Sequence, residues 1–272
     1  MPPTFRIRSL ETGTEYWIYV HRPAEARSPA RNRRRPWTAM VFLDGDNQFS
    51  SAIRAWRAVR KSARGRKRPP LLLVGVGYGA SYGRAANKRG RDYTPTAHSF
   101  EPGSGGARAF LKFLTHTLWP ELARRYPLDP RQRGLGGYSL SALFVLYALF
   151  QKKNFFTHHL AAAPSIWWDD RAVLAQIRRL RAHRRALPAR LFLGVGEKDS
   201  PSMTGDLALL ETQLAENPFA KMKITSRRFP RRTHFTALPV SFRTGLEDLF
   251  SAKKRRKLSR APVGSSPPGW SG

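Results

Sequence analysis

Short, uninterrupted apolar runs alternate along the chain with longer segments in which apolar residues recur at helical spacing. Apolar runs that end in turn-forming residues are typical of strands buried on both faces of a sheet. Strands are expected at 39–43, 71–76, 134–137, 160–163, 190–195 and 221–229. Helices are expected at 50–63, 107–126, 140–150, 171–183, 205–216 and 237–250. This alternation predicts an α/β fold, with a mostly parallel, twisted central sheet and helices on both faces.

The first twenty residues follow a different pattern. Residues 5–8 alternate between apolar and basic side chains, and residues 15–20 are rich in β-forming residues. A turn sequence at 12–14 separates them, so an antiparallel hairpin is predicted at the N-terminus. Because neither an internal repeat nor a linker is evident before residue 251, we expect one α/β domain over residues 1–250.

The composition adds an unusually high positive charge. The 272 residues include 49 Lys and Arg against 18 Asp and Glu, which gives a formal charge of +31. Residues 251–272 hold six of the basic residues, no acid and several Pro, Gly and Ser, which predicts a disordered basic tail. Removing those six charges from +31 leaves +25 spread over residues 1–250.

The charge invites a nucleic-acid interpretation, but no zinc-finger, K-homology or RNP-type motif accompanies it. We therefore expect no specific nucleic-acid partner, although non-specific binding through the basic surface stays open. With 41% hydrophobic residues the chain can bury a core, and with no cysteine it has neither disulfide nor thiol nucleophile. No apolar run of about 18 residues and no apolar leader is present, which predicts a cytoplasmic protein that does not span a membrane.

Candidate chemistry lies where three of the expected strands end, the edge at which such sheets bind ligands. The first candidate is Ser139, in the sequence Gly137-Tyr138-Ser139-Leu140-Ser141 between a strand and a strongly apolar helix. This is the context of a nucleophile elbow, a sharp turn that needs small residues two positions either side of the serine. Gly137 meets that need, and Ser141 replaces the usual glycine.

An acid and a base follow in the order expected for a serine hydrolase. Asp199 closes the sequence Gly196-Glu197-Lys198-Asp199 after a strand, and His234 lies in a loop between the last strand and the last helix. The order Ser139, Asp199, His234 is that of α/β-hydrolases. A carboxylate in this position orients the histidine that activates the serine, and Glu197 is the alternative acid.

An oxyanion hole and a substrate pocket would complete such a site. The backbone N–H of Leu140 is the expected first oxyanion donor, and that of Gly45 or Asp46 the second. Trp167 and Trp168 could wall an acyl or aryl pocket or pack in the core, and we expect one of each.

Two further residues are candidates for contact with the substrate. Arg91 could meet an anionic substrate or pair with Asp92, and Tyr78 follows another strand. Residues with metal-ligand spacing and a nucleotide-type glycine loop are both missing, so neither a metal nor a cofactor is expected.

With these residues in place, the chain resembles the α/β-hydrolase family known as putative esterases, and most of all its branch of siderophore trilactone esterases. The resemblance runs from about residue 5 to residue 250. It rests on the elbow and on 42–46, 74–78, 91–95, 104–107, 110–114, 163–170 and 196–198, of which 163–170 is the most specific.

The resemblance implies a serine carboxylic-ester hydrolase that forms an acyl-enzyme, with Ser139 as nucleophile and His234 as base. Its substrate would be a small ester, siderophore-like and anionic, to which the positive charge would be attracted. The sequence departs from the family at Ser141-Ala142, where Gly-Gly is usual, and the acid position varies within the branch. Two alternatives stay open: an acyltransferase, and a non-catalytic anion- or nucleic-acid-binding protein on a hydrolase scaffold.

Overall fold

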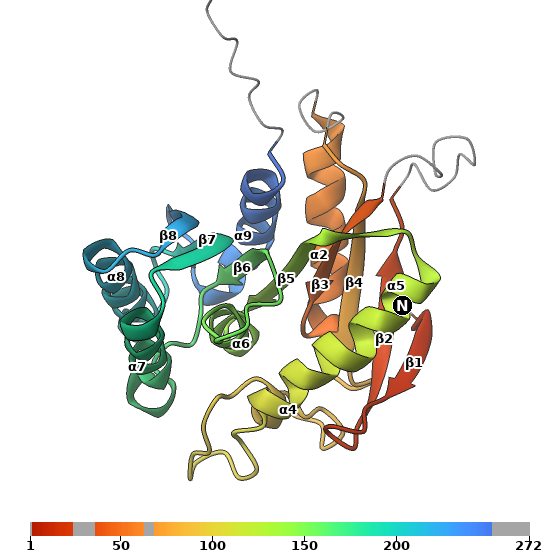
Figure 1. Cartoon of the computed structure of the whole chain (residues 1–272), viewed down its shortest axis with the longest axis horizontal. Coiled ribbons are helices and arrows are strands. Elements are labelled where there is room, and N and C mark those ends of the chain that lie inside the picture. The colour runs from red at the N-terminus through yellow and green to blue at the C-terminus, as the bar shows by residue number, and fades with distance from the viewer. Residues whose placement is uncertain (1, 24–35, 63–67, 252–272) are drawn as a thin grey trace, which may run out of the picture.

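The computed structural model describes residues 2–23, 36–62 and 68–251 of the chain (Figure 1). The predicted basic tail lies outside these residues, apart from Ser251.

An eight-stranded sheet forms the centre of the described structure, in the order β1-β2-β4-β3-β5-β6-β7-β8. The first two strands form the predicted hairpin, β2 runs antiparallel to β4, and every later pairing is parallel. The strands are β1 Phe5–Arg8, β2 Glu15–His21, β3 Trp37–Phe42, β4 Leu71–Gly77, β5 Leu128–Tyr138, β6 His158–Ala162, β7 Ala186–Gly196 and β8 Ala220–Phe229.

Helices cover both faces of this sheet, as predicted (Figure 1). On one face α2 and α9 lie side by side, and α4 to α7 lie on the other. The bounds are α2 Gly45–Lys61, α3 Arg89–Asp92, α4 Ala107–Lys112, α5 Trp119–Arg125, α6 Leu140–Leu149, α7 Trp168–His183, α8 Pro201–Glu216 and α9 His234–Leu249. A π-helical turn, Phe113–Leu118, joins α4 to α5 inside the helix predicted at 107–126.

The burial of the central elements follows directly from their sequences. Every residue of β3 and β4 is buried, as expected for apolar runs covered by helices on both faces. Helix α6 is apolar all round, and all of its residues except Leu140 and Tyr147 are buried. A helix without a polar face has to lie in the interior, and α6 does so between the sheet and α4 and α7.

The strand order determines where a ligand-binding crevice lies on the sheet. The chain winds outward in one direction from β3 through β4 and in the other through β5, so the crevice of the fold lies beyond the carboxyl ends of β3 and β5. Ser139 follows β5 directly, and Asp44 lies two residues after the end of β3. Asp199 follows β7, whereas His234 is the first residue of α9 rather than part of a loop, which corrects that expectation.

Candidate active site

Ser139 occupies a sharp turn between β5 and α6. Its φ of 63° and ψ of −123° lie in a region that non-glycine residues rarely adopt, at a typical cost of about 1–3 kcal/mol. The turn is held by a hydrogen bond from the Ser139 N–H to the Ala162 carbonyl, 3.0 Å long. A side chain at Gly137 would meet the backbone of Ser141 at 2.6 Å, so only glycine fits there. The predicted elbow geometry is therefore present.

Ser141, the departure from the usual glycine, is fully buried and closes the turn from inside. Its hydroxyl accepts from the Tyr138 N–H at 2.9 Å and donates to the Tyr138 carbonyl at 2.8 Å. The extra hydroxyl thus satisfies two backbone groups of the elbow, and Ser139 still reaches its strained conformation.

Asp199 and His234 lie in direct contact. The Nδ1 atom of His234 is 2.9 Å from Oδ2 of Asp199, whose side chain is 2% exposed. The other oxygen, Oδ1, accepts from the Ser200 N–H at 2.8 Å, which fixes the carboxylate. Glu197 instead accepts from the backbone N–H of Arg231 at 3.3 Å. The geometry therefore favours Asp199 over Glu197 as the partner of His234.

The start of α9 holds His234 in this position. Thr233 and Thr236 form a reciprocal capping box at the helix N-terminus. The Tyr138 hydroxyl, next to Ser139, donates to the His234 carbonyl at 2.5 Å. This hydrogen bond connects the elbow to the start of α9.

Ser139 and His234 line one shared cleft of about 410 Å³, together with Ser165, Trp167, Lys198 and several neighbours. The Ser139 hydroxyl lies 3.4 Å from the Ser165 hydroxyl, and the Ser165 N–H donates to the Ser139 carbonyl at 3.3 Å. Ser165 was not among the predicted site residues, although it falls in the specific stretch 163–170. Hydroxyl-bearing residues near a nucleophile are the signal that could have identified it.

The segment expected to supply the second oxyanion donor is held rigidly. Asp44 is buried, and its backbone has the left-handed helical conformation, with φ of 54°. Arg89 donates to both of its carboxylate oxygens, at 3.0 and 3.1 Å. A side chain at Gly45 would meet the Val76 backbone at 2.8 Å. Gly45 and Asp46 open α2, where the first N–H groups of a helix have no acceptor within the helix. Their N–H groups are thus suited to bind an anion, and Arg89 is a further residue that the sequence did not reveal.

The tryptophans divide as expected. Trp167 is 38% exposed and lines the cleft, whereas Trp168 is 2% exposed and donates its indole N–H to the Thr96 carbonyl and hydroxyl. Trp168 is therefore a packing residue, which corrects its inclusion among the substrate contacts. Phe235, 88% exposed and next to His234, adds a second aromatic side chain to the cleft.

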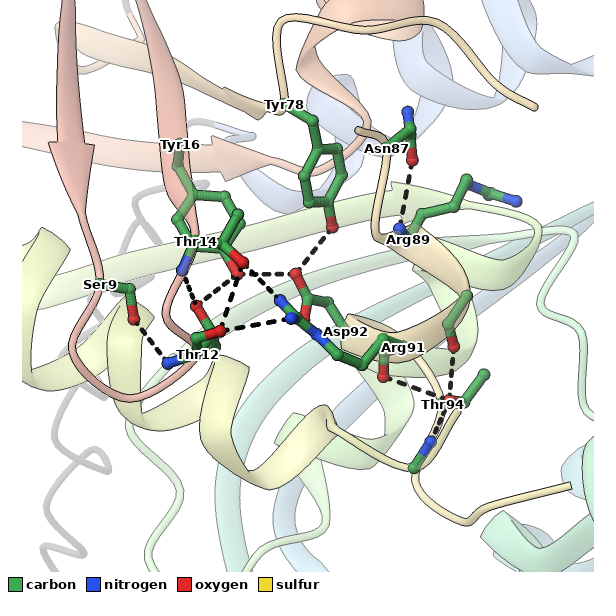
Figure 2. Close-up of polar contacts among 12 residues, drawn as sticks. Ser9, Thr12, Thr14, Tyr16, Tyr78, Asn87, Arg89, Arg91, Asp92 and Thr94 are labelled. Carbon is green, nitrogen blue, oxygen red and sulfur yellow. Dashed lines mark hydrogen bonds and ion pairs between the residues drawn. The ribbon is translucent and has the colours of Figure 1, made fainter. Parts of the chain in front are cut away.

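Arg91 and Tyr78 belong to a buried network around Asp92 and not to the cleft (Figure 2). Arg91 pairs with Asp92 at 2.8 Å and also donates to Thr14, so its guanidinium is engaged by the protein. The Tyr78 and Tyr16 hydroxyls donate to the same carboxylate at 3.0 and 2.6 Å. Burial raises the pKa of Asp92, although Arg91 and the two hydroxyls act to lower it. Of the two roles suggested for Arg91, the structure shows the pair with Asp92, and Tyr78 binds the same carboxylate; both side chains brace the segment that follows β4.

The sequence also predicts neither a metal site nor a membrane-spanning segment. The described residues include no group of three or more His, Asp or Glu that could hold a metal ion. Across the same residues, no helix has the length and apolar character needed to cross a bilayer.

Comparisons with known proteins identify the family of the chain. The family model described as "Putative esterase" matches residues 9–237. The ferri-bacillibactin esterase BesA of Bacillus subtilis is 26% identical over 256 residues, which cover 88% of this chain and 86% of BesA. The siderophore triacetylfusarinine C esterase of Aspergillus fumigatus is 30% identical over 168 residues, covering 60% of this chain and 56% of that protein.

Solved structures show the same fold. The BES protein of Bacillus cereus superposes with a TM-score of 0.77 at 25% identity, covering 91% of this chain and 94% of that one. The siderophore hydrolase EstB of Aspergillus nidulans gives 0.76 at 20% identity, with coverage of 91% and 94%. The α/β-hydrolase fold and the prediction of a serine carboxylic-ester hydrolase are confirmed. Because the family model spans most of the chain, the protein belongs to the putative esterase family, within the branch that contains the siderophore esterases.

Proposed function

We propose that the protein hydrolyses siderophore-like carboxylic esters through a Ser139–His234–Asp199 triad and an acyl-enzyme intermediate. The observation that carries the proposal is the 2.9 Å contact between His234 Nδ1 and Asp199 Oδ2 in the same cleft as Ser139. The strained elbow at Ser139 supports it, because such a turn exposes the serine hydroxyl at the end of its strand.

The first half of the reaction forms the acyl-enzyme. The Asp199 carboxylate keeps the His234 proton on Nδ1, which leaves Nε2 free to act as the base. Ser139 Oγ attacks the ester carbonyl carbon while its proton moves to Nε2. When the tetrahedral intermediate collapses, the C–O bond to the alcohol breaks and His234 returns the proton to the departing oxygen.

The second half releases the acid. A water molecule gives its proton to His234 Nε2 and attacks the acyl carbon, and Ser139 leaves with that proton. Both tetrahedral intermediates carry negative charge on oxygen, for which the N–H of Leu140 is one proposed donor and that of Gly45 or Asp46 the other. The rigid setting of Asp44 and Gly45 supports this role, since preorganised donors need no reorganisation during the reaction.

In the proposed reaction, the Ser165 hydroxyl holds the side chain of Ser139 before substrate binds. This hydroxyl is the hydrogen-bond partner of Ser139 Oγ, at the long distance of 3.4 Å. In the proposed reaction Ser139 turns about χ1 from Ser165 toward His234, as catalytic hydrogen bonds in empty sites often tighten only when substrate binds.

The substrate class follows from the relatives and from the walls of the cleft. Several relatives are named for esters of siderophores, among them bacillibactin, enterobactin and triacetylfusarinine C. In this chain Trp167 and Phe235 offer aromatic surface, and Lys198 adds a positive charge. These features suit a small anionic ester with aromatic or apolar groups, held by stacking and by charge.

The direct test of the proposed function is ester hydrolysis by matched serine variants. We expect Ser139→Ala to reduce kcat for a p-nitrophenyl ester by about 10⁴–10⁶-fold, as loss of the nucleophile does in other triads. Ser165→Ala, which removes the neighbouring hydroxyl, should keep kcat within about tenfold of the unmodified protein. Unchanged hydrolysis in Ser139→Ala would rule out the proposed nucleophile.

A further inference from the structure

A second and larger cavity lies between α6 and α7, apart from the cleft that holds Ser139. It has a volume of about 850 Å³, against about 410 Å³ for the cleft, and the two share no lining residue. Both helices cover the same face of the sheet (Figure 1). The cavity follows α7 from Ala172 to its last residue, His183, a length of about 17 Å at helical rise, and ends at Arg184.

The inner wall of the cavity is apolar. Phe150 and Leu180 lie at its base, 2% and 7% exposed, and Tyr147 and Ala172 are half-buried beside them. Gln176 does not disturb this surface, because its side-chain amide donates to the carbonyls of Tyr147 and Phe150, at 3.0 and 3.1 Å. Burial of a ligand's apolar surface against such a wall stabilises the complex by about 25 cal/mol per Å² of surface removed from water.

The rim of the cavity is positively charged at the end far from the active site. Lys152, Arg179 and Arg184 line it there, together with His183, and no acidic residue lines the cavity. Between residues 140 and 189 the only acids are Asp169 and Asp170, neither of which contributes to the lining. A pocket of one charge sign with low-dielectric walls concentrates ions of the opposite sign.

Two of these cations are free to bind a ligand. Among the described residues, the side chains of Lys152 and Arg179 have neither a hydrogen bond nor an ion pair, and both are exposed. Arg184 is different, since it donates to the carbonyls of Ala186 and Lys152 at 2.8 and 3.0 Å. Arg184 thereby fixes the backbone that carries Lys152 at the rim.

We infer that this cavity binds an amphipathic anion, a molecule with one carboxylate or phosphate headgroup on an apolar chain or ring. The apolar part would lie along Phe150 and Leu180, and the headgroup would lie between Lys152 and Arg179. A guanidinium group binds either headgroup through paired hydrogen bonds. Neither wall nor rim alone defines the ligand; the combination of an apolar wall with a cationic end does.

The site is distinct from the ester chemistry but close to it. Thr96 lines the cavity and accepts the indole N–H of Trp168, and Trp167, the next residue, lines the catalytic cleft. The inference does not depend on the proposed triad, because binding in this cavity requires no contact with Ser139 or His234.

Calorimetric titration of the full chain with octanoate, octyl phosphate and 1-octanol tests this inference. We expect saturable binding of at least one of the two anions, and binding of 1-octanol at least tenfold weaker. The double variant Lys152→Gln/Arg179→Gln should raise the Kd of the anion at least tenfold. The single variant Arg179→Gln has a matched control in Arg178→Gln, which also removes one positive charge from α7 but lies outside the cavity, where Arg178 contacts Gln213. This control should change Kd less than twofold.

A second variant tests the wall without changing any charge. Ala172→Trp places a bulky side chain in the cavity and should abolish binding of both anions while Lys152 and Arg179 remain. The inference is overturned if neither anion binds saturably, if 1-octanol binds as tightly, or if Arg178→Gln weakens binding as much as Arg179→Gln. Binding that survives both Ala172→Trp and the double variant would place the anion elsewhere. None of these measurements needs ester hydrolysis, so a failure of the proposed function would leave their outcome unaffected.

Discussion

Ser141 shows how a single side chain can keep the elbow intact when a glycine is replaced. The hydroxyl bonds both polar groups of the Tyr138 backbone, inside a fully buried turn. Without that hydroxyl the Tyr138 N–H would be left unsatisfied, at a typical cost of about 1–3 kcal/mol. The departure from the family pattern is therefore compensated locally, and Ser139 keeps its half-buried position at the edge of the cleft.

Asp199 and Glu197 lie two residues apart, and the proposed triad assigns them different roles. Asp199→Asn should lower kcat by about 10³–10⁴-fold, because an amide favours the wrong histidine tautomer. Glu197→Gln, which removes the same charge from the same turn, should lower kcat less than threefold. The measurement is steady-state hydrolysis of one p-nitrophenyl ester by both variants. An equal loss in the two variants would reject Asp199 as the specific partner of His234.

At the scale of elements, the sheet edge is built from turns held by contacts between distant parts of the chain. The loop after β3 is held by Arg89 from α3, and the start of α9 is held by Tyr138 from the end of β5. Helix α7 begins regularly only after Asp169, Asp170 and Arg171, which are all left-handed. Arg171 reaches across to Asp206 of α8 at 2.7 Å and so joins two elements beside the cleft.

Such contacts explain which parts of the structure the sequence could reveal. Strand and helix positions follow from local apolar patterns, and the order of Ser139, Asp199 and His234 follows from their places at strand ends. The contact of Ser165 with Ser139 and the pairing of Arg89 with Asp44 join residues 26 and 45 positions apart. No local pattern encodes such pairs. The indole N–H of Trp168 likewise binds Thr96, 72 positions away, whereas the pair of Arg91 with its neighbour Asp92 was one of the two roles that the sequence suggested.

Arg89 is expected to act as a positioning residue for the loop at Asp44. Arg89→Gln leaves the buried Asp44 carboxylate without its ion-pair partner, which should destabilise the fold by about 3 kcal/mol. Displacement of the Gly45 backbone should lower kcat more than it raises KM. The control, Lys88→Gln, removes an adjacent exposed charge and should alter neither quantity. Denaturant unfolding and steady-state kinetics test this together; unchanged kcat in a folded Arg89→Gln protein would contradict the positioning role.

On the scale of the whole molecule, we expect the formal charge of +31 to affect the association of anionic substrates more than the fold. Residues 1–250 carry +25 of this charge, a figure that already subtracts acids such as Glu211, which pairs with Arg228. A field of this sign attracts anions over distances of about the Debye length, roughly 10 Å at 0.1 M salt. Charge of this kind affects association rates and solubility, whereas the chemistry depends on the few residues at the sheet edge.

Salt dependence tests this role of the charge. Raising ionic strength from about 0.02 M to 0.5 M should lower kcat/KM severalfold for an anionic ester, because screening removes the attraction. For a neutral ester of the same acyl group kcat/KM should change little. Equal salt sensitivity for both esters would show that the charge does not steer substrate.

The most direct test of the central claim, that Ser139 is the activated nucleophile, is covalent labelling followed by intact-protein mass spectrometry. A fluorophosphonate transfers its phosphonyl group to the attacking serine oxygen with loss of fluoride, so labelling reports the nucleophile without reference to any substrate. The account predicts one label per chain in the unmodified protein and in Ser165→Ala, slow labelling in Asp199→Asn, and none in Ser139→Ala. A protein that takes up no label, or one labelled equally in Ser139→Ala, would contradict it.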